Sequence, residues 1–288
     1  MTWQLLLAAY LVLGTVVALL QRRLGRTIPQ HNRLANGFFF VCVHYPLGLI
    51  LAAILGFHLD IGWFNFFTLA VMGISFPLTD MLIFRASKDV DAGLVGILNN
   101  LTPVITIALA ALLLSERLSG QQLIGALIIA VSALAVSIIT YEQGSKSRKT
   151  GIMLALLSIT LLGLGTVYET WILKRIGMGS VLIYGQGLQT FWMAVFAWPY
   201  RHGIKQIINR KYGAEIVTWA FSKSLKGFAF LGALTLSKSA AIVGAFTGFL
   251  PVMVVLAAYF VLKERSYLRV KIIAAAAGAV GLVILSLG

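Results

Sequence analysis

Long runs of apolar residues, separated by short polar connections, extend along the whole chain of 288 residues. Each run contains about 20 residues, the length that an α-helix needs to cross roughly 30 Å of hydrocarbon. Ten such runs predict transmembrane helices near residues 3–20, 37–55, 63–84, 93–115, 121–140, 151–172, 180–199, 217–236, 240–262 and 269–287. The predicted fold class is therefore an all-α polytopic membrane protein.

The composition agrees with this class and argues against a large soluble domain. Hydrophobic residues make up 59% of the chain and charged residues 11%, whereas soluble domains carry roughly 25% charged residues. The longest connection, residues 202–214, is predicted to lie on the membrane surface as an amphipathic segment.

The net charge of +14 could indicate a nucleic-acid partner, but its distribution indicates a membrane instead. Of the 23 lysines and arginines, 19 lie in or beside the odd-numbered connections between the predicted helices and 4 in the even-numbered ones. Under the positive-inside rule the odd-numbered connections are cytoplasmic and both termini lie outside. The charge then faces the cytoplasm and anionic lipid, so no nucleic-acid partner is predicted.

Two segments 148 residues apart share one pattern. Residues 92–117 and 240–265 each contain an apolar helix with an internal proline, Pro103 or Pro251, and each ends in a Glu-Arg pair without a gap in the alignment. Internal repeats with interrupted helices commonly build the central site of a transporter.

The repeat divides the ten predicted helices into two groups of five. Because five is odd, the second group must enter the membrane in the opposite orientation to the first. The sequence therefore predicts two inverted five-helix repeats, residues 1–144 and 145–288, related by a pseudo-two-fold axis in the membrane plane.

The two prolines mark the first group of candidate site residues. A proline frees the carbonyl four residues earlier, which belongs to Asn99 for Pro103 and to Thr247 for Pro251. Polar residues at such a kink can hold a polar ligand or a water near the midplane, or the kink can serve packing alone. The candidates for substrate binding are Asn99, Asn100, Thr102 and Thr247, and those for a hinge are Pro103, Pro251, Gly96, Gly244 and Gly248.

Ionisable residues at membrane depth form the second group, because they are costly there and are functional candidates by default. His44 and Lys226 are candidate substrate contacts, although His44 can also be a satisfied core histidine. Asp80 is the candidate for proton coupling, or it pairs with a nearby cation. Lys223 is expected to extend its ammonium to the membrane interface.

The predicted seventh helix adds polar and aromatic candidates. Gln186 and Gln189 are three residues apart, so they share a helix face that Trp192 extends. Gln189 and Trp192 are the substrate-binding candidates of this helix.

Enzyme motifs and cofactor motifs do not occur in the sequence. No His, Asp and Glu cluster has metal-ligand spacing, and no Gly-rich phosphate loop is present. The single cysteine, Cys42, excludes an intrachain disulfide. We therefore expect no enzyme activity, no cofactor and no metal, and any transport is expected to be secondary because no ATP motif is found.

The chain resembles the drug/metabolite transporter superfamily, and its EamA group most of all. The segments that carry the resemblance are Leu101-Thr102-Pro103-Val104 through Glu116-Arg117, and Leu250-Pro251-Val252 through Glu264-Arg265. The resemblance implies a basket-like bundle whose third, fourth, eighth and ninth helices line a central cavity. Well-known members place both termini in the cytoplasm, whereas the charge distribution here predicts the reverse.

These observations predict a secondary transporter in the cytoplasmic membrane that moves a small metabolite by alternating access. The substrate is expected to be amino acid-like, nucleoside-like or amphipathic, with protons as a candidate coupling ion. Membrane lipids are the other expected partners, and a monomer suffices because both halves lie in one chain. The alternative is a non-transporting membrane protein, such as a lipid scramblase or an assembly partner.

Overall fold

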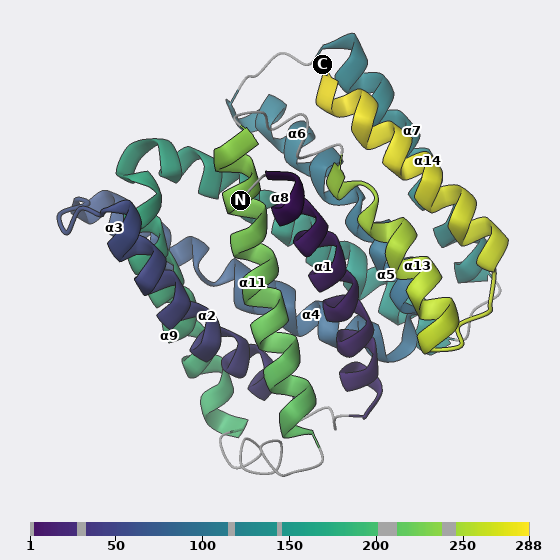
Figure 1. Cartoon of the computed structure of the whole chain (residues 1–288), viewed down its shortest axis with the longest axis horizontal. Coiled ribbons are helices and arrows are strands. Elements are labelled where there is room, and N and C mark those ends of the chain that lie inside the picture. Colours follow the sequence, from purple (N-terminus) through teal and green to yellow (C-terminus); the bar gives the residue numbers. More distant parts are fainter. Residues whose placement is uncertain are drawn as a thin grey trace.

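A computed structural model of the chain describes residues 3–27, 33–114, 119–142, 146–200, 212–237 and 246–287. Over these residues the secondary structure is helical and contains no strand. The helices form one bundle (Figure 1). They are α1 (Trp3–Thr27), α2 (Arg33–Leu55), α3 (Trp63–Met72), α4 (Ser75–Asp89), α5 (Ala92–Asn99), α6 (Leu101–Leu114), α7 (Gly120–Glu142), α8 (Lys146–Ser180), α9 (Gln186–Ala197), α11 (Gly213–Ser237), α13 (Leu250–Val261) and α14 (Leu268–Leu287), with a π-helical turn η2 (Val181–Gly185) and a 3₁₀ turn η3 (Trp198–Tyr200) on either side of α9.

Seven stretches of the described helices are long and apolar enough to cross a membrane. Four predicted spans correspond directly to α1, α2, α7 and α14, and two more correspond to the pairs α3–α4 and α5–α6. The seventh stretch is the N-terminal part of α8. The remaining predicted spans fall on α9, α11 and α13, so the total of ten stays a prediction. The predicted surface segment at residues 202–214 lies almost entirely outside the described residues.

The outer surface of the bundle is apolar, as expected for contact with lipid. Large hydrophobic side chains are widely exposed on it, among them Ile54, Trp63, Leu112 and Phe260. A water-soluble protein rarely exposes apolar surface on this scale. The chain is therefore an integral, multi-pass membrane protein.

Helix breaks occur just before three of the prolines. The α3–α4 break lies at Gly73 and Ile74 ahead of Pro77, and the α5–α6 break lies at Asn100 ahead of Pro103. A turn at Gly248 and Phe249 precedes α13, which contains Pro251. Pro46, by contrast, lies inside the uninterrupted helix α2. Pro77, Pro103 and Pro251 each lie in the first turn of the helix after the break, where the N–H that proline lacks has no helical acceptor.

Another break separates the sixth and seventh predicted spans. Gly177 has φ 76° and ψ 164° within the segment assigned to α8. A side chain is strongly disfavoured at such positive φ, so glycine allows the chain to turn there. The polypeptide then continues through η2 into α9.

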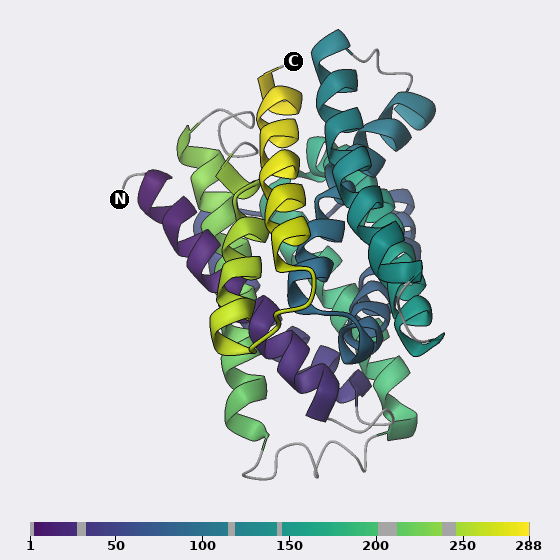
Figure 2. The same ribbon diagram turned by 90° about the vertical axis from the view of Figure 1, so that its right-hand side faces the viewer.

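The most extensive helix contacts join residues from the two predicted halves. Helix α1 packs against α11, α4 against α8, α2 against α9, α5 against α13, and α7 against α14. Figure 2 shows α14 running alongside α7. The largest hydrophobic core lies between α4, α5, α7, α8 and α14, around Leu94, Leu98, Ile129 and Ala275.

Candidate functional site

An ion pair connects α4 and α11 inside the helical bundle. Lys223 Nζ donates to both carboxylate oxygens of Asp80, at 2.6 and 2.8 Å. The side chains are 24% and 17% exposed, respectively. The ammonium of Lys223, which the sequence predicted to extend to the membrane interface, binds Asp80 inside the bundle in this structure. The pairing of Asp80 with a nearby cation, one of its two predicted roles, is present in this conformation.

Aromatic rings surround the ammonium of Lys223. Its Nζ lies 3.9 Å from the ring centre of Phe40 and 5.0 Å from that of Trp219. A ring face attracts a cation, so both rings stabilise the charge in a region poor in water. Trp219 is itself fully buried and makes an edge contact with Phe84, at 4.8 Å between ring centres.

His44 lies within this same region, on α2. Its ring is stacked between Phe40 and Phe228, at 4.9 and 5.1 Å between ring centres. The Nε2 atom lies 3.0 Å from Nε2 of Gln186 on α9. If the amide donates there, the ring carries its proton on Nδ1. Neither Nδ1 of His44 nor Oε1 of Gln186 has a hydrogen-bond partner among the described residues.

Lys226 is one helical turn beyond Lys223 and faces α1. Its Nζ lies 5.0 Å from the ring centre of Tyr10. A Cβ placed on Gly14 would lie 3.4 Å from Cε of Lys226 and 2.8 Å from Cδ1 of Leu250. The lysine stem therefore runs across α1 towards the first residues of α13.

The proline-associated candidates lie on α5, α6 and α13. Asn100 is buried and a Cβ on Gly278 of α14 would lie 2.8 Å from its Nδ2, whereas Asn99 is exposed. The two amides therefore face different surroundings. Thr102 Oγ1 is buried without a hydrogen-bond partner among the described residues. Thr247 lies in the short helical stretch before the turn at Gly248.

Among the predicted hinge residues, Gly96 lies at the crossing of α5 and α13. A Cβ there would lie 3.4 Å from Val254 Cγ1 and 3.7 Å from the Cα of Pro251. Pro251 and Gly248 are buried, and Pro103 is half-buried. Gly244, the repeat equivalent of Gly96, lies outside the described residues.

Trp192 and Gln189 occupy α9. Trp192 Nε1 donates to the carbonyl of Ala70 at 2.7 Å. That carbonyl lies next to the α3–α4 break, where Ile74 N–H bonds to Val71 instead, so the indole takes the place of a helical donor. Gln189 is half-buried. The partner of His44 is Gln186, which the sequence placed on the same face.

A second, more deeply buried ionic cluster connects the ends of α1, α5, α8 and α14. Its members are Arg22 of α1, Asp91 before α5, Arg148 of α8, Glu264 before α14 and Lys271 of α14. We call it the end cluster.

Asp91 accepts from three cations in the end cluster. Its carboxylate lies 2.8 Å from Lys271, 2.9 Å from Arg148 and 3.4 Å from Arg22. Burial alone would raise the pKa of this carboxyl, but the three cations and the hydrogen bond from Lys271 outweigh burial and leave the pKa below its ordinary value. Asp91 is therefore held in its charged form.

Glu264 explains part of the repeated Glu-Arg motif. Its Oε1 accepts from Arg22 Nε at 3.0 Å, and its Oε2 accepts from the backbone N–H of Ala92 at 3.0 Å. The carboxylate thus satisfies a free donor at the start of α5. The equivalent pair Glu116-Arg117 lies outside the described residues.

The end cluster was not identifiable from the sequence as a unit. Arg22, Asp91, Arg148 and Lys271 look like ordinary residues of the cytoplasmic connections. The one signal was the repetition of Glu264, which marked a residue but not its partners.

At the opposite end of the bundle, the connection after α2 touches the start of the seventh predicted span. The backbone N–H of His58 donates to Ser180 Oγ at 3.0 Å, and Tyr184 donates to the carbonyl of Leu59 at 2.5 Å. In the described contacts, odd-numbered connections between the predicted helices meet at one end of the bundle, in the end cluster. Even-numbered connections meet at the other end.

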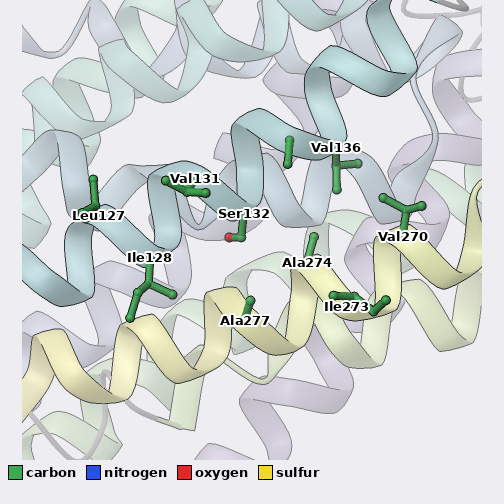
Figure 3. Close-up of a pocket in the computed structure, with 10 residues that line it drawn as sticks. Leu127, Ile128, Val131, Ser132, Val136, Val270, Ile273, Ala274 and Ala277 are labelled. Carbon is green, nitrogen blue, oxygen red and sulfur yellow. The ribbon is translucent and has the colours of Figure 1, made fainter.

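An apolar groove of about 440 Å³ runs between α7 and α14. Figure 3 shows the lining side chains, which are aliphatic except for Ser132. Leu127, Val131 and Ile273 on its rim are more than half exposed. The groove therefore opens towards lipid and offers one hydroxyl for polar recognition.

A multi-pass helical bundle with broken helices and an ion pair inside the bundle is typical of small-molecule membrane transporters. Comparison with known proteins supports this class. Residues 1–138 match the family described as "EamA-like transporter family". These residues, just under half of the chain, are thus similar to that family, which is part of the drug/metabolite transporter superfamily. The predicted resemblance is confirmed, and this family is generally non-enzymatic.

The fold is also similar to a solved structure described as "Crystal structure of protein". The similarity covers 96% of this chain and 98% of that one, with a TM-score of 0.54 and 16% sequence identity. At this identity the match concerns the fold alone. No curated protein matches the chain.

Proposed function

We propose that the chain is a secondary transporter that moves a small metabolite across the cytoplasmic membrane. Two inverted five-helix halves, residues 1–144 and 145–288, would rock about a central site to give alternating access. The site would include His44, Asp80 and Lys226, with Lys223 added to the residues expected from sequence. Both termini would lie outside, as the charge distribution predicts.

The pairing of helices supports the inverted repeat. The first helix of each half packs on the third helix of the other, as α1 on α11 and α8 on α4. Second helices pair with each other (α2 with α9), as do fourth helices (α5 with α13) and fifth helices (α7 with α14). A two-fold axis between the halves produces this reciprocity. The breaks at Asn100 and Gly248, 148 residues apart, add to it.

The observation that carries the proposal is the ion pair of Asp80 and Lys223. It joins the third helices of the two halves, and both side chains remain partly accessible. Ionisable residues inside a membrane protein mark substrate or ion pathways by default. In this conformation Lys223 donates to both carboxylate oxygens of Asp80, so a proton that binds Asp80 would weaken the ion pair between the two helices.

The two ends of the bundle support alternating access. The end cluster links α1 and the start of α5 to α8 and α14, and therefore links the two halves at one end. The contacts of His58 with Ser180 and of Leu59 with Tyr184 link them at the other. Opening either end requires that its own contacts separate.

A ligand screen tests the proposal. The purified protein is heated in the presence of amino acids, nucleosides, sugar phosphates, organic acids and cationic drugs. A ligand at a hundred times its Kd stabilises the folded state by about 2.7 kcal/mol, which gives a measurable rise in Tm. Each hit is then assayed for uptake into proteoliposomes, with and without a pH gradient.

Matched variants locate the site. We expect Asp80→Asn and Lys223→Met to lose both the thermal shift and the uptake. Asp60→Asn and Lys88→Met remove the same charges from exposed positions and should keep both activities. Uptake that is unchanged in Asp80→Asn would remove the ion pair from the mechanism, and unchanged pH dependence would remove proton coupling through Asp80.

The alternative of a lipid scramblase requires a polar groove that opens to lipid. The groove between α7 and α14 opens to lipid but is apolar. The imidazole of His44 and the charged groups of Asp80, Lys223 and Lys226 lie instead between α1, α2, α4, α9 and α11. This arrangement favours a solute transporter.

A further inference from the structure

Lys226 occupies the middle of α11 and of the predicted span at residues 217–236. It lies about 18 Å along the helix from either end, given a rise of about 1.5 Å per residue. A lysine side chain is too short to carry its ammonium to either interface from that depth. The charge of Lys226 is therefore accommodated inside the bundle.

No carboxylate among the described residues lies within 4.0 Å of the Lys226 ammonium. The nearby Asp80 is already bound by Lys223 through both oxygens. The only contact described for the Lys226 ammonium is the ring of Tyr10, at 5.0 Å. Among the residues that the structure describes, the two lysines and one aspartate of this region therefore leave one positive charge without a carboxylate partner.

The surroundings of Lys226 are aromatic and aliphatic. Tyr10 lies 5.7 Å from Phe230 between ring centres, and these rings border the ammonium on the side of α1 and α11. Gly14 and Leu250 border the lysine stem. Leu250 directly follows the turn that interrupts the chain before α13, so the ammonium lies near one of the two proposed hinges.

An uncompensated cation inside the membrane is costly, and a bound anion offsets the cost. We propose that Lys226 binds the anionic group of the transported substrate, so that the substrate class is small organic anions carrying a carboxylate or a phosphate. The apolar part of the substrate would contact Tyr10 and Phe230. This inference rests on the proposed transport function and specifies its substrate.

The test compares probes that differ only in charge. Thermal shifts are measured with benzoate, benzamide and benzylamine, with phenyl phosphate and phenol, and with inorganic phosphate. The proteins are the unaltered chain, Lys226→Met, Lys226→Arg and Lys88→Met, the last removing a lysine charge from an exposed position of α4.

The expected result is stabilisation by the anionic probes alone. Lys226→Met should weaken their apparent Kd by roughly tenfold or more, the effect of losing one charge-assisted contact, while Lys226→Arg and Lys88→Met should retain binding. Binding of benzoate or phenyl phosphate that is equally tight in Lys226→Met would overturn the assignment.

The outcomes separate this inference from the proposed function. Stabilisation by the neutral or cationic probes alone would leave a small-molecule transporter in place but exclude an organic-anion substrate. Silence of every probe here and of every compound in the broader panel would contradict both.

The ligand-free variants give an independent check. If Lys226 has no counter-charge in the protein, Lys226→Met should have a Tm equal to or higher than that of the unaltered chain. A Tm that falls well below it would show that the protein itself pairs Lys226, and would overturn the inference.

Discussion

Arg22 and Glu264 are 242 residues apart in sequence, yet the guanidinium Nε donates to the carboxylate Oε1 at 3.0 Å. Both side chains are about 95% buried. The same carboxylate accepts from the N–H of Ala92. One glutamate thus joins the end of α1 to the beginning of α5, and this contact is the centre of the end cluster.

Removing one partner of this pair should strongly destabilise the protein. Either Arg22→Met or Glu264→Gln leaves a buried charge with only its weaker counter-charge, which is Arg26 at 3.5 Å from Glu264 or Asp91 at 3.4 Å from Arg22. The loss of unfolding free energy should therefore approach about 3–5 kcal/mol, which is typical of a broken buried pair. Unfolding of the two single variants and the double variant measures the coupling between the residues.

The exposed pair of Arg23 and Glu215 is the matched control. Its atoms are also 3.0 Å apart, but the arginine side chain is 62% exposed. Arg23→Met should cost less than about 1 kcal/mol, because water screens such pairs. Equal losses of unfolding free energy in Arg22→Met and Arg23→Met would show that burial does not strengthen the ion pairs of the end cluster.

Asp91 should make stability depend on pH only in the acid range. Its folded pKa is lowered, since the attraction of Lys271, Arg148 and Arg22 outweighs the effect of burial. A group with a lowered folded pKa stabilises the protein above its unfolded pKa, about 4, and this contribution is lost as the pH falls through the folded pKa. The Tm should therefore be insensitive to Asp91 titration between pH 7 and 5 and decline below pH 4.

The variant Asp91→Asn checks this assignment. It should unfold at lower temperature than the unaltered chain at pH 7, with a smaller further decline below pH 4. Asp60→Asn, on an exposed loop, should follow the unaltered chain. A loss of the Asp91 contribution already between pH 7 and 5 would contradict the lowered pKa.

Glycine substitutions in α7 should have opposite effects at two positions. A Cβ on Gly125 would lie 2.5 Å from the backbone nitrogen of Leu285 and 2.6 Å from the carbonyl oxygen of Gly281, so α14 must move. Gly125→Ala should therefore cost about 1–3 kcal/mol. At Gly120 no atom lies within 4 Å, and Gly120→Ala should be neutral or stabilise by up to about 1 kcal/mol. If thermal unfolding showed that both variants shift the Tm in the same direction, this close contact would be contradicted.

Cysteine labelling tests the orientation in the membrane. In a Cys42→Ser background, His58→Cys should react with an impermeant maleimide added to intact cells, because its connection is predicted to lie outside. Arg265→Cys, in the connection before α14, should react only after permeabilisation. Both positions are exposed in the structure, so access to reagent depends on the side of the membrane. The reverse pattern would place both termini in the cytoplasm.

Most helices and two of their breaks could be predicted from the sequence, because they depend on local properties. Runs of apolar residues fixed α1, α2, α7 and α14 to within a few residues at most ends, and Pro103 and Pro251 marked two interruptions. These predictions needed no knowledge of which helix lies beside which.

The pairing of side chains could not be predicted in the same way. Whether Lys223 reaches the interface or pairs with Asp80 depends on how α4 and α11 are rotated relative to each other. Gln186 and Gln189 share a face by spacing, but the π-helical turn Val181–Gly185 precedes them and alters the helical phase, so spacing alone does not say which amide meets His44. The partners of Glu264 come from segments distant in sequence.

The close contact between α7 and α14 also determines where movement can occur. These two helices end the first and second halves, and their backbones touch at Gly125 and Gly281 without room for a side chain. Helices α2 and α9 lie on the far side of the bundle from this contact (Figure 1). If the halves turn about the α7–α14 line, displacement grows with distance from it, so α2 and α9 travel farthest. A spin label on each of these two helices would then report the largest change in distance.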